Sequence, residues 1–270
     1  ASSKGISLIS IAPRQSIVDK TEQIEWIKAR PNSDTALILG ICHTLLEESL
    51  YNINFLKKFT VGYEKFFQHL TGQSDGVMKN AEWAERLSGV SSYEIMSLAR
   101  KMANTPTMLS ITWSLTRQEN GEQAYWAVIA LAAMLGQMGK PGLGVGFGYT
   151  VSNYLGNNVR RLPFEALPQG KNKVDDFIPV ARLTDMLLNP GKSFDFNGEK
   201  RIYPTIDLIY WAGGNPFHHH QDLNRLVDAW QKPSTIIVNE WCWNSLAKHA
   251  DIVLPCTTTL ERNDLGMTPR

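Results

Sequence analysis

Apolar residues recur at helical spacing through the first hundred positions of the chain. In "NSDTALILGICHTLLEESL" they fall on one helix face, with Ser33 or Asp34 as the capping residue. In "SSYEIMSLARKMAN" Ser91 and Glu94 form a capping box ahead of the apolar face of another helix. A short strand over residues 6–11 precedes these helices. The expected helices cover residues 32–50, 54–59, 63–70, 81–87 and 91–104.

From Thr107 the pattern changes to alternating strands and helices. The runs "TMLSITW", "IDLIYWA", "STIIVNE" and "DIVLP" are almost continuously apolar, and loops and helices separate them. This pattern predicts parallel strands buried on both faces and joined by right-handed crossovers, which is a doubly wound α/β fold. An irregular insertion rich in Gly, Pro and Asn, at about residues 140–205, interrupts the series. A loop of that length is usually functional or ordered around a ligand.

Composition narrows the functional classes. Apolar residues make up 43% and charged residues 20% of the chain, which is a normal globular mixture. The net charge of +1 does not favour a nucleic-acid or membrane-surface partner. The longest apolar run, residues 124–135, is shorter than the roughly 20 residues of a membrane span and predicts a buried helix. Cys42, Cys242 and Cys256 are too far apart in sequence for a C-x-x-C metal motif.

Both ends suggest an internal part of a longer protein. The chain opens at "ASSKGISLISIAP", without an initiator Met or a signal peptide, and stops in the turn-like "ERNDLGMTPR".

Three strand ends carry unusual loops: "TWSLTRQ", "AGGNPFHHHQ" and "NEWCWN". In parallel α/β sheets ligands bind beyond the carboxyl ends of the strands. Gly213 and Gly214 allow close approach of the backbone, Arg117 can hold an anion, and a helix N-terminus suits a phosphate. Together these loops predict a nucleotide-binding edge.

Three consecutive histidines, residues 218–220, follow the second of these strands. Consecutive side chains point about 100° apart in a helix and to opposite faces in a strand, so the rings do not converge on one ion. We expect one ring to contact a ligand while its neighbours pack or stay exposed; a purely structural role is the alternative.

Two further stretches have both a functional and a structural interpretation. The glycines of "GKPGLGVGFGYT" lack the dinucleotide spacing, and this backbone either lies against a flat ligand or leads from a helix end into a loop. In "ADIVLPCTTTLERND" an acidic side chain could accept the N–H groups of a guanine edge, or the segment is a polar turn.

Several long segments, in this order, resemble the molybdopterin oxidoreductases of the dimethyl-sulfoxide reductase type, close to the branch of biotin sulfoxide and trimethylamine-N-oxide reductases. The segments are "AEWAERLSGV", "GEQAYWAVIALAAMLGQMGKPG", "AGGNPFHHHQDLNR" and "KHADIVLPCTTTLERNDL". The resemblance implies a molybdenum ion held by two molybdopterin guanine dinucleotides. It also implies reduction of biotin sulfoxide, dimethyl sulfoxide or trimethylamine N-oxide by oxygen-atom transfer, and it favours a cytoplasmic over a periplasmic protein.

The resemblance also assigns domains and cofactor contacts. Residues 1–108 would be the later portion of a first dinucleotide-binding α/β domain, and residues 109–270 a second, Rossmann-like one. The family's metal-ligating serine would precede Ala1, so no residue here is expected to bind metal or to be catalytic. Ala12 replaces an acidic residue common in relatives, and Cys256 replaces a smaller residue and is expected only to pack. The implied cofactor contacts are Trp113, Ser114, Arg117, Gly214, Asn215, His219, Asn239, Glu240 and Arg262 or Asp264.

Two other functional classes remain as alternatives. An NAD(P)-dependent oxidoreductase would need the glycine fingerprint after a strand with an acidic residue about 20 positions on, which the sequence lacks. An α/β module that only binds a partner protein would keep the fold without the cofactor.

Overall fold

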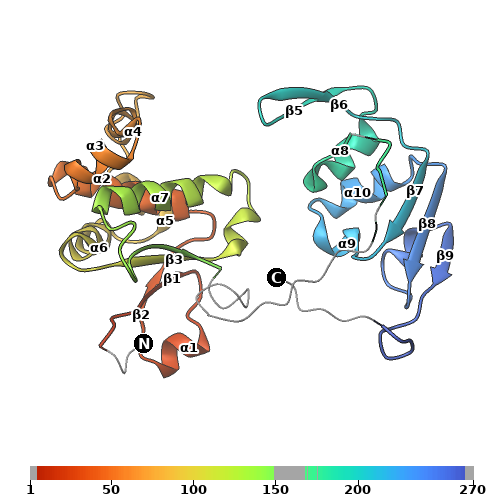
Figure 1. Cartoon of the computed structure of the whole chain (residues 1–270), viewed down its shortest axis with the longest axis horizontal. Helices are drawn as coiled ribbons and strands as arrows, with labels where there is room; N and C mark the ends of the chain where they lie inside the picture. Colours follow the sequence, from red (N-terminus) through yellow and green to blue (C-terminus); the bar gives the residue numbers. More distant parts are fainter. Residues whose placement is uncertain (1–4, 149–167, 169, 175, 265–270) are drawn as a thin grey trace. The chain divides into compact units, whose positions relative to one another are not determined.

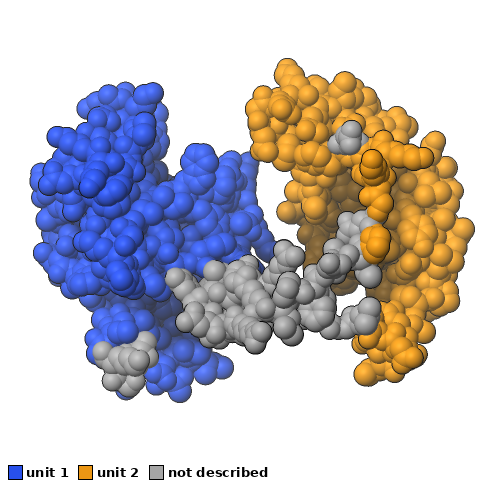
Figure 2. Space-filling model, in the orientation of Figure 1, with its two compact units in different colours: residues 1–160, 270 blue, residues 161–269 orange. Residues whose placement is uncertain are grey.

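The structure is a computed structural model that describes residues 5–148, 168, 170–174 and 176–264. Contacts divide the chain into two compact units, residues 1–160 with 270 and residues 161–269, coloured separately in Figure 2. Part of the predicted insertion, residues 149–167, lies outside the described residues. Among the described residues, no helix is both long enough and apolar enough to cross a membrane.

Unit 1 is mainly helical, with two short pairs of parallel strands (Figure 1). The predicted helices and the first strand are confirmed, while α1, β2 and β4 were not predicted. The elements are β1 (Ile9–Ala12), α1 (Ile17–Thr21), β2 (Glu25–Lys28), α2 (Asp34–Glu47), α3 (Ile53–Phe59), α4 (Tyr63–Leu70), α5 (Ala81–Ser88), α6 (Ser92–Asn104), β3 (Met108–Ile111), the 3₁₀ helix η2 (Trp113–Thr116), α7 (Glu122–Leu135) and β4 (Gly144–Phe147).

Local hydrogen bonds at the N-termini of α6 and α2 agree with the expected capping residues in one of the two helices. The α6 capping box is present: Glu94 N donates to Ser91 Oγ over 3.2 Å, and Ser91 N donates to Glu94 Oε2 over 3.2 Å. Helix α2 starts after Ser33 as expected, but the Ser33 hydroxyl donates to the Arg30 carbonyl instead of capping the helix.

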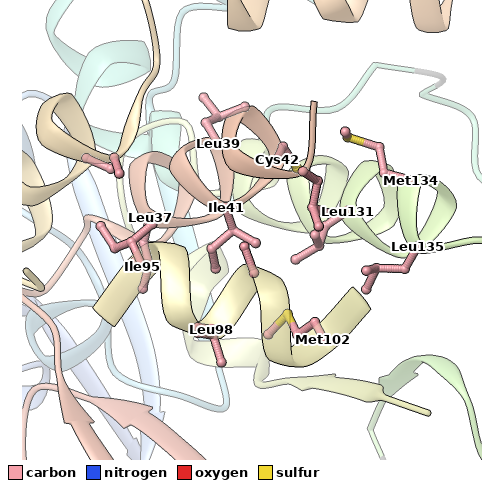
Figure 3. Close-up of a cluster of buried hydrophobic side chains, with 14 of the residues drawn as sticks. Leu37, Leu39, Ile41, Cys42, Ile95, Leu98, Met102, Leu131, Met134 and Leu135 are labelled. Atoms are coloured by element: carbon pink, nitrogen blue, oxygen red, sulfur yellow. The ribbon is translucent and has the colours of Figure 1, made fainter. Parts of the chain in front are cut away.

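The core of unit 1 surrounds α2, which packs against α5, α6 and α7. Figure 3 shows side chains of α2, α6 and α7 meeting in this cluster. Helices α2 and α5 approach closely at Gly40, where an added Cβ would lie 2.5 Å from the Cβ of Ala84. The cluster includes Leu37, Ile41, Leu45, Ile95, Leu98, Met102, Leu131 and Met134.

Unit 2 contains a three-stranded parallel sheet in the order β7-β8-β9 and a smaller antiparallel hairpin. The three predicted strands are confirmed, and the helix α10 lies between the first two of them, as the predicted alternation of strands and helices requires. The elements are the 3₁₀ helix η3 (Val180–Arg182), α8 (Leu183–Leu188), β5 (Ser193–Phe196), β6 (Glu199–Ile202), β7 (Leu208–Ala212), α9 (Pro216–His219), α10 (Leu223–Trp230), β8 (Thr235–Glu240), the 3₁₀ helix η4 (Ala247–His249) and β9 (Ile252–Pro255).

The part of the insertion that the structure describes contains more regular structure than expected. Residues 183–202 form α8 and the β5–β6 hairpin, whose turn holds Asn197 and Gly198 at φ of 51° and 81°. Arg225 of α10 donates to Asp185 of α8 over 2.6 Å, so the insertion is joined to the helix of the sheet unit.

The α/β class with parallel strands is confirmed, but two details differ from the prediction. Strand β3, expected in the same sheet as β7, pairs with β4, because the glycine-rich segment extends alongside it and takes up its hydrogen bonds. The assignment of residues 1–108 and 109–270 to two dinucleotide-binding domains stays a prediction.

The second difference concerns the faces of the β7–β8–β9 sheet. Residues from both crossovers, Trp230 and Leu246 among them, belong to the same core cluster as Val238. When two successive right-handed crossovers add strands in the same direction across a sheet, both crossovers cover the same face of that sheet. Within the described residues the opposite face is therefore open, and Leu208, Tyr210, Ile252 and Leu254 are 53%, 56%, 45% and 42% exposed.

Candidate functional site

The carboxyl ends of β7, β8 and β9 share one edge of the unit 2 sheet. The strands are parallel, with Ala212 opposite Asn239 and Glu240 opposite Pro255. The loops after all three strands therefore start side by side. Five of the predicted residues lie at this edge or in the turn that follows it: Gly214, Asn215, His219, Asn239 and Glu240. Arg262 and Asp264 come later, in the segment that follows β9.

The turn after β7 leaves its backbone uncovered. Gly213 and Gly214 have φ of 78° and 73°, in the left-handed region that favours glycine, and an added Cβ would meet nothing within 4 Å at either position. Asn215 follows as the N-cap of α9, and its Oδ1 accepts from Phe217 N over 3.0 Å. Pro216 occupies the first turn of α9, as suits a residue without an N–H.

The three histidines have three different surroundings. His218 Nε2 lies 3.3 Å from Ser245 Oγ in the loop after β8. His220 is partly buried, and burial, with a smaller contribution from neighbouring His219, lowers its pKa. His219 is exposed, and its ring makes no hydrogen bond to the part of the chain that the structure describes. The contact of His219 with a ligand stays a prediction.

Glu240 shapes its own loop. Its Oε1 accepts from Trp241 N over 3.0 Å, and its Oε2 accepts from Asn244 Nδ2 over 2.6 Å. The Glu240 carbonyl accepts from Cys256 N over 3.3 Å, which extends the β8–β9 pairing by one residue. Cys256 itself is exposed, so the expectation that it only packs is wrong. Both carboxylate oxygens and the backbone carbonyl of Glu240 thus already accept hydrogen bonds within the chain.

Asn239 and its neighbours are more open. Asn239 Oδ1 accepts from Tyr210 OH over 3.1 Å, across the β7–β8 pair on the open face of the sheet. Trp241 and Trp243, in the loop after β8, are 66% and 73% exposed. Exposed indole rings at a strand end offer flat surfaces on which a planar ring system can stack.

Arg262 and Asp264 interact with each other. Arg262 Nε and Nη2 lie 3.0 and 2.9 Å from Asp264 Oδ2, and Arg262 Nη1 donates to the Thr257 carbonyl over 3.0 Å. Glu261 accepts from the backbone N–H and the hydroxyl of Thr258, and these bonds lower its pKa. The predicted pairing of an acidic group here with a guanine edge stays a prediction, and Asp264 already accepts from Arg262.

The other predicted residues belong to unit 1. Trp113 and Ser114 lie in η2, directly after β3, and the Arg117 backbone N–H closes this turn on the Ser114 carbonyl over 3.0 Å. Trp113 is 43% exposed, and its ring centroid lies 5.6 Å from that of Phe147 at the end of β4. The structure brings these three together, and their participation in one site with the unit 2 residues stays a prediction.

A separate apolar cleft contains none of the predicted residues. It has a volume of about 590 Å³ and lies in unit 1, lined by Leu39, Phe66 and Trp126 among others. Its lining is mostly apolar, which suits an apolar partner better than a charged dinucleotide. In the described part of the chain, no group of three or more His, Cys, Asp or Glu side chains is arranged to hold a metal ion.

Sequence reasoning missed one residue that joins the loops at the unit 2 edge. Ser245 lies within 3.3 Å of both Asn215 Nδ2 and His218 Nε2. A single serine in "WCWNSLAKHA" has no pattern that marks it. Only the placement of its loop beside the turn after β7 reveals it.

Comparisons with known proteins add to this geometry. The family model described as "Molybdopterin oxidoreductase" matches residues 1–269. The chain is 44% identical over 267 residues to the biotin sulfoxide reductase of Cereibacter sphaeroides, covering 99% of this chain and 36% of that protein. It is 45% identical over 276 residues to the trimethylamine-N-oxide reductase of Haemophilus influenzae, covering 97% of this chain and 33% of that protein.

A third relative and a solved structure agree with these matches. The dimethyl sulfoxide/trimethylamine N-oxide reductase of Cereibacter sphaeroides is 43% identical over 272 residues, covering 97% of this chain and 33% of that protein. The chain thus spans about a third of the length of these relatives. Acetylene hydratase from Pelobacter acetylenicus has a similar fold, with a TM-score of 0.58 and 16% identity over 94% of this chain and 37% of that one.

Proposed function

The chain belongs to the molybdopterin oxidoreductase family, and we propose that it is the central part of an enzyme that reduces S-oxides or N-oxides by oxygen-atom transfer. The relatives at 43–45% identity are named for biotin sulfoxide, trimethylamine N-oxide and dimethyl sulfoxide. The expected substrates are small oxides of this kind. The similarity to biotin sulfoxide reductase favours a cytoplasmic enzyme.

The proposed cofactor is molybdenum with two molybdopterin guanine dinucleotides. The family name supports the molybdopterin, and the unit 2 edge supports the dinucleotide form. The observation that carries this is the uncovered backbone at Gly213 and Gly214, next to the exposed His219 and two exposed indole rings. Phosphates, a ribose and a planar base are the groups for which such a strand end is suited.

The residues of this chain are proposed to bind and orient the cofactor. Gly214 offers its backbone N–H, and Asn215 fixes the turn by accepting from Phe217 N. His219 and Arg117 are exposed donors that suit anionic oxygens. The further proposed contacts are Trp113, Ser114, Asn239, Glu240, Arg262 and Asp264.

The bound molybdenum centre would supply the two-electron chemistry in which the oxide loses its oxygen as water, with uptake of two protons and two electrons. Around it, the protein would exclude bulk water and hold the dinucleotides in place. We assign no catalytic residue and no metal ligand within this chain. The 270-residue chain alone is therefore expected to lack reductase activity.

The test uses the full-length protein that contains this chain, expressed in a host that makes the cofactor. Molybdenum and acid-released guanine are measured per polypeptide, and reduction of the three oxides is followed with a reduced viologen dye as the electron donor. The expected result is both cofactor components and turnover of at least one oxide. Absence of both components would refute the proposed function. Oxide turnover by the 270-residue chain alone would instead show that the expectation of an inactive fragment is wrong.

A further inference from the structure

A closed circuit of contacts joins the loop after β7 to the loop after β8. Phe217 N donates to Asn215 Oδ1 over 3.0 Å, and Asn215 Nδ2 donates to Ser245 Oγ over 3.3 Å. His249 Nδ1 lies 2.7 Å from the Ser245 carbonyl, and the His249 ring stacks on Phe217, with centroids 4.2 Å apart and planes at 19°. Each member of the circuit thus contacts the next, and the last returns to the first.

The donors and acceptors of this circuit fit together. A backbone N–H can only donate, so Asn215 must present its oxygen to Phe217 and its amide nitrogen to Ser245. The Ser245 oxygen accepts that bond and keeps its own proton, which it can donate to His218 Nε2 at 3.3 Å. One hydroxyl therefore holds two side chains of the turn after β7.

The circuit is anchored in the core of unit 2. A carbonyl can only accept, so His249 Nδ1 carries the proton in its bond to Ser245. The backbone carbonyl of His249 accepts from Trp230 Nε1 over 2.9 Å, and Trp230 is fully buried. Phe217, on which the His249 ring lies, is also buried. Ser245 is thus fixed from the protein interior while its hydroxyl faces the turn.

We propose that Ser245 is a positioning residue: its hydroxyl, by holding Asn215 and His218, keeps the turn of Gly213–His219 in the conformation that presents the Gly214 backbone and His219 to the bound dinucleotide. This inference rests on the proposed function and assigns Ser245 no contact with the ligand. A residue with only a core-packing role would affect the stability of the fold alone. Ser245 instead affects retention of the ligand, through the side chains of Asn215 and His218.

The test compares Ser245→Ala, which removes the hydroxyl, with Ser245→Thr, which keeps it. A matched control is Ser234→Ala at the opposite end of the same sheet, because Ser234 Oγ also donates one bond, to the Asp207 carbonyl over 2.9 Å. Each change is made in the full-length protein. Guanine retained per polypeptide after gel filtration measures the cofactor, and hydrogen–deuterium exchange of peptides over residues 213–219 measures the turn.

We expect Ser245→Ala to retain at least about fivefold less cofactor and to exchange faster over residues 213–219, as the loss of two ordinary hydrogen bonds implies. The cofactor retained by Ser245→Thr should stay within about twofold of the wild-type amount. Ser234→Ala should retain as much cofactor as the wild type. Unchanged exchange in Ser245→Ala, or equal cofactor loss in Ser245→Ala and Ser234→Ala, would overturn the role of Ser245. A wild-type protein without guanine would instead refute the proposed function, and this inference with it.

Discussion

Replacing Gly40 with alanine should destabilise the protein even though alanine is the better helix former. A Cβ at Gly40 would lie 2.5 Å from the Cβ of Ala84, whereas carbon atoms pack best at about 3.5–4.0 Å. Both atoms are attached directly to a helix backbone, so no rotamer change relieves the contact, and α2 and α5 must move apart by roughly 1 Å.

Two opposing effects set the size of the change. Overpacking of this kind costs about 1–3 kcal/mol, and the higher helix propensity of alanine returns about 0.8–1.0 kcal/mol. The clash is severe, so the upper part of the first range applies and the net loss is about 1–2 kcal/mol. For a unit of this size the melting temperature should fall by about 2–8 °C, measured by differential scanning fluorimetry of the full-length protein.

A size-swapped double variant isolates the cause. In Gly40→Ala/Ala84→Gly the added methyl group occupies the space that the removed one leaves, and the next neighbour, Ile95 Cγ2, is at an ordinary 3.5 Å. The swap should melt within about 2 °C of the wild type, because the helix propensities nearly cancel. The reasoning would be refuted if Gly40→Ala were as stable as the wild type. It would also be refuted if the double variant lost as much melting temperature as the two single variants lose in sum.

Three further predictions follow from other contacts. His219→Ala should lower guanine retention in the full-length protein more than His220→Ala does, and equal losses would contradict the assignment. Burial lowers the pKa of His43, so below about pH 6.5 the unfolded chain takes up a proton that the folded protein resists. Melting temperature should therefore drop less between pH 7.5 and 5.5 in His43→Leu than in the wild type. Parallel profiles of melting temperature against pH would show that His43 does not cause the loss of stability at low pH. The Gln137 side chain accepts from Thr107 N over 2.7 Å and donates to two backbone carbonyls over 3.2 and 3.1 Å. Gln137→Leu should therefore lower the free energy of unfolding by about 2–4 kcal/mol and speed deuterium exchange at the start of β3. Unchanged exchange at the start of β3 would contradict this prediction.

Elements with a strong local signal were predictable from the sequence. Helix α4 spans Tyr63–Leu70 as the pattern indicates, and the α6 capping box is formed by Ser91 and Glu94. In both cases neighbouring residues determine the structure. The hairpin turn at Asn197 and Gly198 carried an equally local signal, an Asn-Gly pair between alternating residues, so this part of the insertion could have been predicted.

Features that depend on a distant partner were not predictable. Two of the four residues of β4 are glycines, which weaken its strand signal, and the segment is extended because β3 offers it unpaired backbone groups. At the candidate site, strand ends and glycines pointed to loops that the structure places side by side after β7 and β8, and ligand binding by their residues stays a prediction. Ser245 is different, since its importance comes from the distances to Asn215 and His218.

The one-sided sheet of unit 2 has a consequence for the order of folding during synthesis. Its paired residues are close in sequence: Ile237 pairs with Ile252, and Leu208 with Thr235. All residues that these pairings need are therefore present once residues 206–255 have left the ribosome. The nascent chain would then present the open apolar face with Leu208 and Tyr210 to solvent. We expect this stage to be the one at which chaperone binding most improves the yield of the full-length protein.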